Sequence, residues 1–292
     1  MTQPPLLAVP NVSEGRDARL IERLAGAFAS HGARLLDVHS DADHNRSVFT
    51  LAGEPGRLAH AVAAGTREAV ARLDLTHHEG VHPRIGVVDV APIVYLEATQ
   101  VGAACAEALV LADLLGEDVQ LPVFLYGALG GGRTRAELRR GGPGAVARRM
   151  AAGELEPDFG PPEPHPTAGV VLVAARAPLI AFNVELGPMA TLEDARAIAA
   201  EIREGGPDGL TGVRALGLWL EQRQRAQLSM NLEDPVATPP ATAVAAIARR
   251  AAVAEAELVG LAPRAALQGL PADLRVRGLR TIEDALRGTA EG

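Results

Sequence analysis

The sequence contains no lysine, and all 28 of its basic residues are arginine. Without a lysine amine the chain cannot form a Schiff base of its own, and it cannot build the phosphate-binding loop that depends on a lysine. Cysteine is almost absent as well. The only one, Cys105, lies in the Ala-rich, helical segment "VGAACAEALVLADLL", where a small buried thiol is expected rather than a nucleophile. A single cysteine also excludes a disulfide within the chain.

Acidic residues outnumber basic ones, and the formal net charge is −8. A nucleic-acid-binding protein would carry a basic stripe, so we expect no nucleic-acid partner. No apolar run is expected to reach the length of a membrane span, and the N-terminus "MTQPPLLAVPNVSEG" lacks the basic and apolar regions of a signal peptide. These absences predict a cytoplasmic protein that does not associate with membranes.

The same order of predicted elements occurs in each half of the chain. The first half gives strand, helix, strand, strand, helix and strand, from "LLAV" to "RIGVVDVAPIVYL", with the polar turn "DADHN" between the middle strands. A helix at about 99–116, a strand "PVFLYG" and a Gly-, Pro- and Arg-rich region at 128–168 follow, and the order then repeats from "PLIAFNVEL" to "LVGLAP". We therefore predict an α+β protein of two ferredoxin-like (βαββαβ) subdomains, residues 1–179 and 180–292, packed sheet to sheet around a small-molecule site.

His78, Glu79 and His82 spell H-E-x-x-H, the signature of a zinc protease. That motif works because an unbroken helix places both imidazoles on one face. Here Gly80 lies between the two histidines, and Pro83 pushes the residue before it out of the helical conformation. We therefore predict that this segment is extended or turned, and that it holds no metal.

His82 then stands at the entrance of a predicted strand, with Arg84 on the same face if the chain is extended. A single histidine at such an edge is more often structural than catalytic, but other polar residues are unusually placed around the chain. All four asparagines lie at strand edges or turns: Asn11, Asn45, Asn183 and Asn231. Gln227, Ser229 and Asn231 alternate along one strand, which indicates either a ligand-binding surface or a solvent-facing edge.

Several segments, taken together and in order, resemble the glutamate formiminotransferase family. They are "VPNVSEGRD", "LLDVHSDADHNRSVFTLAG", "GVHPRIGVVDVAPIV", "LYG", "PDFGP", "HPTAG", "LIAFNVEL" and "AQLSMNL", and the resemblance covers roughly residues 5–265. It implies two ferredoxin-like lobes that face each other across a folate-binding tunnel. It also implies transfer of the formimino group of N-formimino-L-glutamate to N5 of tetrahydrofolate, which is a co-substrate, and a homodimer.

The resemblance also assigns roles to residues. The family's catalytic histidine lies in its "HPR" motif, which is His82 here, and an imidazole with a pKa of about 6.5 can both accept and donate a proton near neutral pH. Because both substrates carry several carboxylates, Arg46 and Arg84 are expected to bind them. The remaining candidates for substrate or folate binding are Asp37, His39, Asn45, His165, Thr167, Gly169, Asn183, Gln227 and Asn231.

The chain departs from the family pattern at "GVVLVAAR", residues 169–176, where relatives have small and hydroxyl side chains. Val170, Val171 and Leu172 are expected to narrow the space for a pterin. Two alternatives stay open: a paralogue that acts on another formyl or formimino one-carbon substrate, and a catalytically silent folate- or metabolite-binding protein on the same scaffold.

Overall fold

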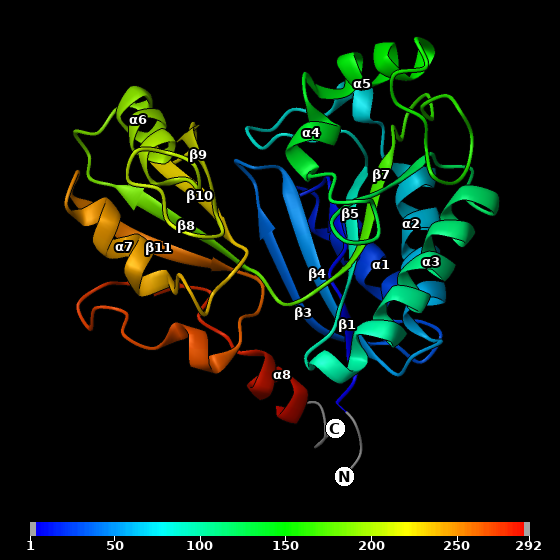
Figure 1. The fold of residues 1–292 in the computed structure, drawn as a ribbon, viewed down its shortest axis with the longest axis horizontal. Helices are drawn as coiled ribbons and strands as arrows, with labels where there is room; N and C mark the ends of the chain where they lie inside the picture. The colour runs from blue at the N-terminus through cyan, green and yellow to red at the C-terminus, as the bar shows by residue number, and fades with distance from the viewer. Residues whose placement is uncertain (1–3, 289–292) are drawn as a thin grey trace. The chain divides into compact units, whose positions relative to one another are not determined.

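The computed structural model describes residues 4–288, and the chain divides between Ala177 and Pro178 into two compact units, here called unit 1 and unit 2 (Figure 1). Among the described residues there are two β-sheets, one in each unit, and eight α-helices. The predicted mixture of helices and sheets in two units is therefore confirmed at this level.

The elements of unit 1 follow the predicted order and then extend it. They are β1 (Leu6–Ala8), β2 (Asn11–Val12), α1 (Ala18–Phe28), β3 (Arg34–Asp41), β4 (Arg46–Gly53), α2 (Leu58–Arg72), the 3₁₀ helix η1 (Leu75–His77), β5 (Val88–Val94), the 3₁₀ helix η2 (Ala98–Gln100), α3 (Val101–Glu117), β6 (Val123–Leu125), α4 (Arg135–Arg139), α5 (Gly142–Ala151) and β7 (Val171–Arg176).

The sheet of unit 1 has the order β3, β4, β1 with β2, β5, β7, β6. β1 and β2 form one row that is interrupted at Pro10, and both pair with β4 and β5. Proline has no N–H to donate to a sheet ladder, which accounts for the break. The turn "DADHN" joins β3 and β4 as an antiparallel hairpin, as predicted. β7 was not predicted; it runs parallel to β5 and β6 between them.

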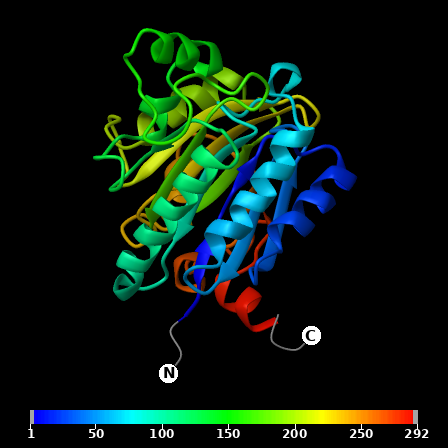
Figure 2. The same cartoon turned by 90° about the vertical axis from the view of Figure 1, so that its right-hand side faces the viewer.

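Helices α1, α2 and α3 cover one face of this sheet (Figure 2). Their apolar side chains form a core with the strands, and this core contains Phe28, Phe49 and Val171. On the other face α4 and α5 pack over a second core, which contains Phe124 and Leu172. Successive residues of β7 thus point into different cores, as the two-residue period of a strand requires.

One helical segment of unit 1, Ala98–Glu117, is long and apolar enough to cross a membrane by length and composition alone. The expectation that no run reaches this length is therefore wrong for this segment. In the structure α3 packs against α2, β5 and β7, and a core helix packed in this way passes the same test.

The N-terminus of α2 receives its cap from α3. Arg57 stands at the N-cap position and provides no side-chain acceptor for the first turn. Instead the buried carboxylate of Glu107 accepts hydrogen bonds from the backbone N–H of Gly56 and from that of Ala59, the latter at 2.7 Å. A negative charge at this end of a helix also interacts favourably with the helix dipole.

We expect Glu107→Ala to lower the free energy of unfolding by about 2–3 kcal/mol, because the buried N–H of Ala59 and the part-buried N–H of Gly56 lose a charged acceptor. Urea denaturation followed by circular dichroism measures this. Glu117→Ala, at the exposed end of the same helix, is the matched control and should change stability by less than about 0.5 kcal/mol. Equal changes in the free energy of unfolding for the two substitutions would show that capping by Glu107 does not stabilise the protein.

Unit 2 also shows the predicted order of strand, helix, strand, strand, helix and strand. Its elements are β8 (Ile180–Leu186), α6 (Leu192–Ile202), β9 (Val213–Leu220), β10 (Arg225–Leu232), α7 (Pro240–Ala248), β11 (Val253–Val259), the 3₁₀ helix η3 (Arg264–Leu267), β12 (Val276–Arg277) and α8 (Ile282–Gly288). The sheet order is β12, β11, β8, β10, β9. Apolar side chains such as Phe182 and Met230 form the core with α6 and α7.

Candidate active site

The H-E-x-x-H segment is not helical. The 3₁₀ helix η1 ends at His77, and His78 has an extended backbone with φ −80° and ψ 127°. His78 Nε2 lies 2.9 Å from the carbonyl oxygen of Asn45, away from any shared helix face with His82. The prediction that no helix runs through the motif is confirmed. Within residues 4–288, no group of three or more His, Cys, Asp or Glu side chains is arranged to hold a metal ion.

The loop that carries His82 packs closely on the turn of the β3–β4 hairpin. A Cβ on Gly80 would lie 2.5 Å from the carbonyl oxygen of His44, so a side chain at this position would push the two segments apart. Asn45 has a left-handed backbone with φ 47°. Its side chain donates to the carbonyl of Glu79 at 2.8 Å and accepts from the N–H of Gly15 at 2.9 Å. Asn45 therefore ties three loops together.

His82 is held by Arg46 and by its own backbone neighbour. Nη1 of Arg46 lies 2.7 Å from Nε2 of His82, while Nδ1 of His82 lies 2.8 Å from the carbonyl oxygen of Pro83. These partners define a neutral tautomer, because Nδ1–H donates to the carbonyl and Nε2 accepts from the guanidinium. Arg46 also donates to Oδ1 of Asn11, and the ring of His44 lies 5.8 Å from that of His82.

The surroundings of His82 favour the neutral ring. Burial lowers the pKa of His82 well below 6.5, and the positive charges of Arg46 and Arg139 lower it further. Burial also lowers the pKa of Arg46 to about 10, although the carboxylate of Asp89 opposes this shift. At neutral pH the site therefore holds a neutral imidazole, able to accept a proton, against a charged guanidinium.

Asp89 and Arg139 form a buried ion pair beside this histidine. Asp89 lies on β5 with its side chain only 4% exposed, and Arg139 is the last residue of α4 with 15% exposure. Asp89 also accepts a hydrogen bond from the backbone N–H of Ile85 at 2.9 Å. Neither residue was predicted for the site. The only signal was an acidic residue within the apolar strand "GVVDVAP", where a charge needs a partner.

Arg84 stabilises its own loop through hydrogen bonds to the backbone. Its guanidinium donates to the backbone carbonyls of Gly80 at 3.0 Å and His82 at 3.3 Å, and also to that of His78. The sequence suggested that this arginine binds a substrate carboxylate. In the structure its hydrogen bonds go to the backbone, and it lines the site at the same time.

Four of the predicted residues meet around one small pocket: Asn45, Arg46, His82 and Arg84. His82 and Arg84 also line a larger cavity of about 420 Å³. The loop from Gly80 to Arg84 lines this cavity, and so do Arg139 and the turn at 141–143 that leads into α5. The cavity thus joins two segments that are far apart in the sequence.

Asp37 and His39 lie on β3, on the same face of the hairpin as Arg46. In the β3–β4 register Asp41 is opposite Arg46, His39 is opposite Val48 and Asp37 is opposite Thr50. Residues two apart on a strand share a face. The structure therefore brings both residues to the face that carries Arg46, at increasing distance from the turn.

The "HPTAG" segment forms a tight turn before β7. Nδ1 of His165 accepts hydrogen bonds from the N–H groups of Ala168 at 3.0 Å and Thr167 at 3.3 Å. Gly169 has φ 71°, and a Cβ there would lie 2.2 Å from the carbonyl oxygen of Ile85. The turn is thereby held against the end of the His82 loop. The next three residues, expected to face a pterin, are buried in the cores on both faces of the sheet: Val170, Val171 and Leu172.

Asn183 and Gln227 belong to unit 2, on the face of its sheet opposite to Phe182 and Met230. Both are almost completely buried, so the solvent-facing interpretation does not hold for them, while Asn231 on the same face is half-buried. Asn183 donates to Glu257 at 3.2 Å. This face also carries ion pairs of Arg277 with Glu185, Glu255 and Glu257, and of Arg223 with Glu185.

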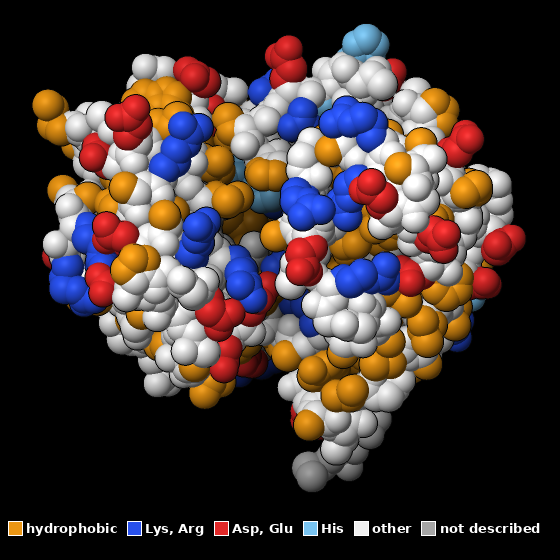
Figure 3. Space-filling model, turned by 45° about the horizontal axis from the view of Figure 1, so that its top comes forward, with side chains coloured by type: hydrophobic (Ala, Val, Ile, Leu, Met, Phe, Trp, Pro, Cys, Tyr) orange, Lys and Arg blue, Asp and Glu red, His pale blue; other side chains and the backbone are white. Residues whose placement is uncertain are grey.

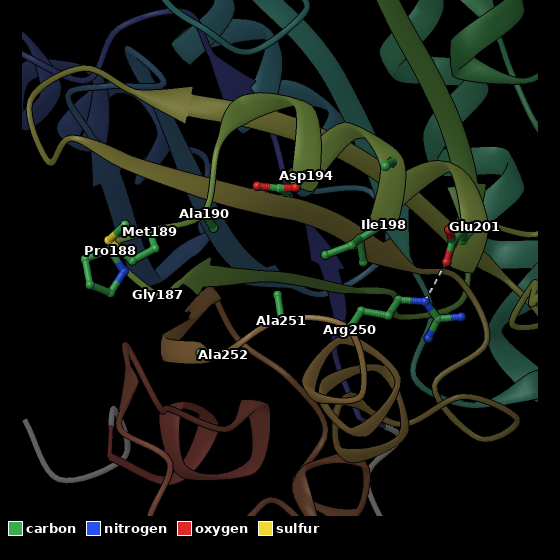
Figure 4. A pocket seen from close by; sticks show the side chains of 11 residues that line it. Gly187, Pro188, Met189, Ala190, Asp194, Ile198, Glu201, Arg250, Ala251 and Ala252 are labelled. Atoms are coloured by element: carbon green, nitrogen blue, oxygen red, sulfur yellow. Dashed lines mark hydrogen bonds and ion pairs between the residues drawn. The ribbon is translucent and has the colours of Figure 1, made fainter.

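Unit 2 contains a separate cavity of about 490 Å³ beside α6 (Figure 4). The charged residues that line it make an ion pair and a helix cap that stabilise unit 2. Arg250 pairs with Glu201 at 2.7 Å, and Asp194 completes a capping box with Thr191 at the start of α6. Among the described residues, no histidine lines this cavity. The arrangement around His82 is therefore the stronger candidate for chemistry.

Comparison with known proteins agrees with the sequence resemblance. Residues 6–176 match the N-terminal subdomain of the formiminotransferase domain, and residues 181–272 match the formiminotransferase domain. Glutamate formimidoyltransferase of Streptococcus pyogenes serotype M1 is 37% identical over 228 residues, which cover 77% of this chain and 76% of that protein. The Thermoplasma acidophilum protein of the same name is 34% identical over 270 residues, covering 89% and 88%.

Formimidoyltransferase-cyclodeaminase of Gallus gallus is 36% identical over 273 residues, which cover 89% of this chain and 50% of that protein. The chain thus spans about half the length of this relative. Together the two matched subdomains take up most of the sequence. The chain belongs to the formiminotransferase domain family.

Proposed function

We propose that this protein is a glutamate formimidoyltransferase that moves the formimino group of N-formimino-L-glutamate to N5 of tetrahydrofolate, with His82 as the acid and base. The observation that carries this proposal is the neutral His82, fixed by Arg46 beside a cavity of about 420 Å³. The two relatives named glutamate formimidoyltransferase support it, because each is matched over three quarters or more of its length.

In this mechanism N5 of tetrahydrofolate attacks the formimino carbon and forms a tetrahedral intermediate. The attacking nitrogen must lose a proton, and the nitrogen of the departing glutamate must gain one. Nε2 of His82 accepts the first proton once the incoming amine replaces Arg46 as its partner, and the resulting imidazolium donates it to the leaving nitrogen. The Nδ1–H bond to the Pro83 carbonyl keeps the ring in the required tautomer.

For the other predicted residues we propose supporting roles. Asp37 and His39 lie on the face that carries Arg46 and are assigned to substrate contact. The turn from His165 to Gly169 is assigned to folate contact through its backbone, because Nδ1 of His165 already accepts N–H groups within the turn. The polar face of unit 2 supplies the remaining candidates, Asn183, Gln227 and Asn231.

We also propose that each unit is a ferredoxin-like subdomain. In unit 2 the strand order β11, β8, β10, β9 places the first and third strands of the repeat in the middle of the sheet, and β3, β4, β1, β5 do the same in unit 1. By the family resemblance we further propose that the protein is cytoplasmic and forms a homodimer. Analytical ultracentrifugation tests whether it is a dimer.

The direct test of function is to incubate the purified protein with N-formimino-L-glutamate and tetrahydrofolate and to identify the folate product by mass spectrometry. We expect formiminotetrahydrofolate and free glutamate in equal amounts. Binding of both substrates without turnover would favour a silent binding protein. Turnover of only an N-formyl donor would favour the paralogue.

The low pKa of His82 leads to a pH prediction. Because this pKa lies well below 6.5, the ring stays neutral, and able to act as a base, while the pH falls through 6.5. We expect kcat/KM for the donor to stay level from about pH 8 to about pH 6 and to decline only at lower pH. A steady-state pH profile measures this. Loss of half the activity at pH 6.5 or above would contradict the assignment of an unprotonated His82.

A further inference from the structure

We propose that Arg139 binds a carboxylate of the formimino donor in the cavity beside His82, in an orientation that Asp89 fixes. This inference rests on the proposed function, since it takes the donor to be a dicarboxylate. It gives the segment that carries α4 and α5 a role in substrate selection. Three features of the structure support it: the position of Arg139, the balance of charge and the neighbouring helix end.

Arg139 and His82 line the same cavity. One terminal nitrogen of the Arg139 guanidinium binds the Asp89 carboxylate. Its Nε is buried without a hydrogen-bond partner among residues 4–288. A guanidinium binds carboxylates through pairs of N–H groups, so this side chain keeps donors for a second carboxylate after it has bound the first.

Among the described residues that line the two pockets at His82, arginines outnumber carboxylates. The charged residues that line the larger pocket are Arg84 and Arg139, and Arg46 lines the smaller one; the one carboxylate among these described residues is Asp89. In Figure 3 several arginine side chains gather on the upper part of unit 1, at the right. An excess of positive charge in a half-buried site favours an anionic ligand, and a dicarboxylate supplies that charge.

The start of α5 adds to this field. α5 has 10 residues, begins at Gly142 and has Gly141 with φ 82° at its N-cap, where the described part of the chain shows no side-chain capping hydrogen bond. Gly141 to Pro143 line the same cavity as Arg139. The N–H groups of an uncapped helix N-terminus attract an anion. Arg139 and the N-terminus of α5 therefore both favour an anion in this cavity.

Asp89 makes the arrangement rigid. It lies on β5, binds Arg139 of α4 and accepts from the N–H of Ile85, which follows the His82 loop. A single buried carboxylate thus links the segment that carries Arg139 to the segment that carries His82. The next arginine, Arg140, is exposed and lines neither cavity at His82, so it provides a matched control.

The test compares Arg139→Gln and Arg140→Gln by calorimetry with N-formyl-L-glutamate, a stable analogue of the donor. Two further ligands each lack one carboxylate: N-formyl-L-2-aminobutyrate and N-formyl-4-aminobutyrate. We expect Arg139→Gln to weaken binding of N-formyl-L-glutamate by about tenfold or more, and Arg140→Gln by less than about twofold. For one of the two truncated ligands, wild type and Arg139→Gln should bind equally, because the carboxylate that Arg139 contacts is missing.

Equal loss of affinity for all three ligands, or no loss for N-formyl-L-glutamate, would overturn the inference. If Arg139→Gln does not fold, Arg139→Lys can replace it, because lysine keeps the positive charge but lacks the paired N–H groups of a guanidinium. Unchanged binding of N-formyl-L-glutamate by Arg139→Lys would also overturn the inference. The assay needs no turnover, so the two proposals fail separately. If the wild type transfers the formimino group but Arg139→Gln does not weaken binding, only the inference about Arg139 fails. If the wild type binds the dicarboxylate through Arg139 but transfers nothing, only the proposed function fails.

Discussion

Replacing His82 with alanine is expected to lower kcat by roughly 10²–10⁴ while the affinity for the formimino donor changes by less than about tenfold. The reason is that proton transfer matters in the transition state, whereas the imidazole contributes little to holding the ground-state substrate. Steady-state kinetics with a separate measurement of donor binding distinguish the two effects. The loss of kcat in His82→Ala should also depend on pH, because water takes the place of the imidazole as general acid and base in that variant.

His77→Ala is the control for this experiment. His77 precedes the motif, and its side chain is 86% exposed, so its removal should leave kcat within about twofold of the wild type. Circular dichroism of both variants shows whether the fold is retained. Near-normal turnover of a folded His82→Ala enzyme would remove the acid and base assignment and favour a binding protein or another chemistry.

Replacing Asp89 with alanine is expected to lower the free energy of unfolding by about 3–5 kcal/mol. This substitution leaves the guanidinium of Arg139 without its counter-ion in a largely buried place, and breaking such a pair from one side costs far more than the pair contributes. It also leaves the N–H of Ile85 without its acceptor. Denaturant unfolding with linear extrapolation measures the change.

A second aspartate–arginine pair provides the comparison. Arg250 is as buried as Arg139, with 16% exposure, but its partner Asp208 is 68% exposed, and Arg250 also pairs with Glu201. Asp208→Ala should therefore cost no more than about 1 kcal/mol. The double variant Asp89→Ala, Arg139→Ala should be less destabilised than Asp89→Ala alone. A double variant that is at least as unstable as the single one would show that the buried charge is not the cause.

The sequence correctly predicted elements whose signals are local. The turn "DADHN" forms the β3–β4 hairpin, and the helix predicted after the strand "LLAV" is α1. By contrast β7 was missed. It is a central, parallel strand with core on both faces, so its residues read as a continuous apolar run without the alternation that marks a strand.

For the site, the sequence by itself determined that the H-E-x-x-H segment is not a zinc helix, because the effects of Gly80 and Pro83 act on the backbone next to them. Only the tertiary structure decided which groups surround His82. Arg46 is 36 residues away from it, and Arg139 is 50 residues away from Asp89. The burial and charges that lower the pKa of His82 come from these distant segments, and no local pattern encodes them. A sequence fixes backbone conformation through neighbouring residues, whereas the protonation state of a side chain depends on what folding packs against it.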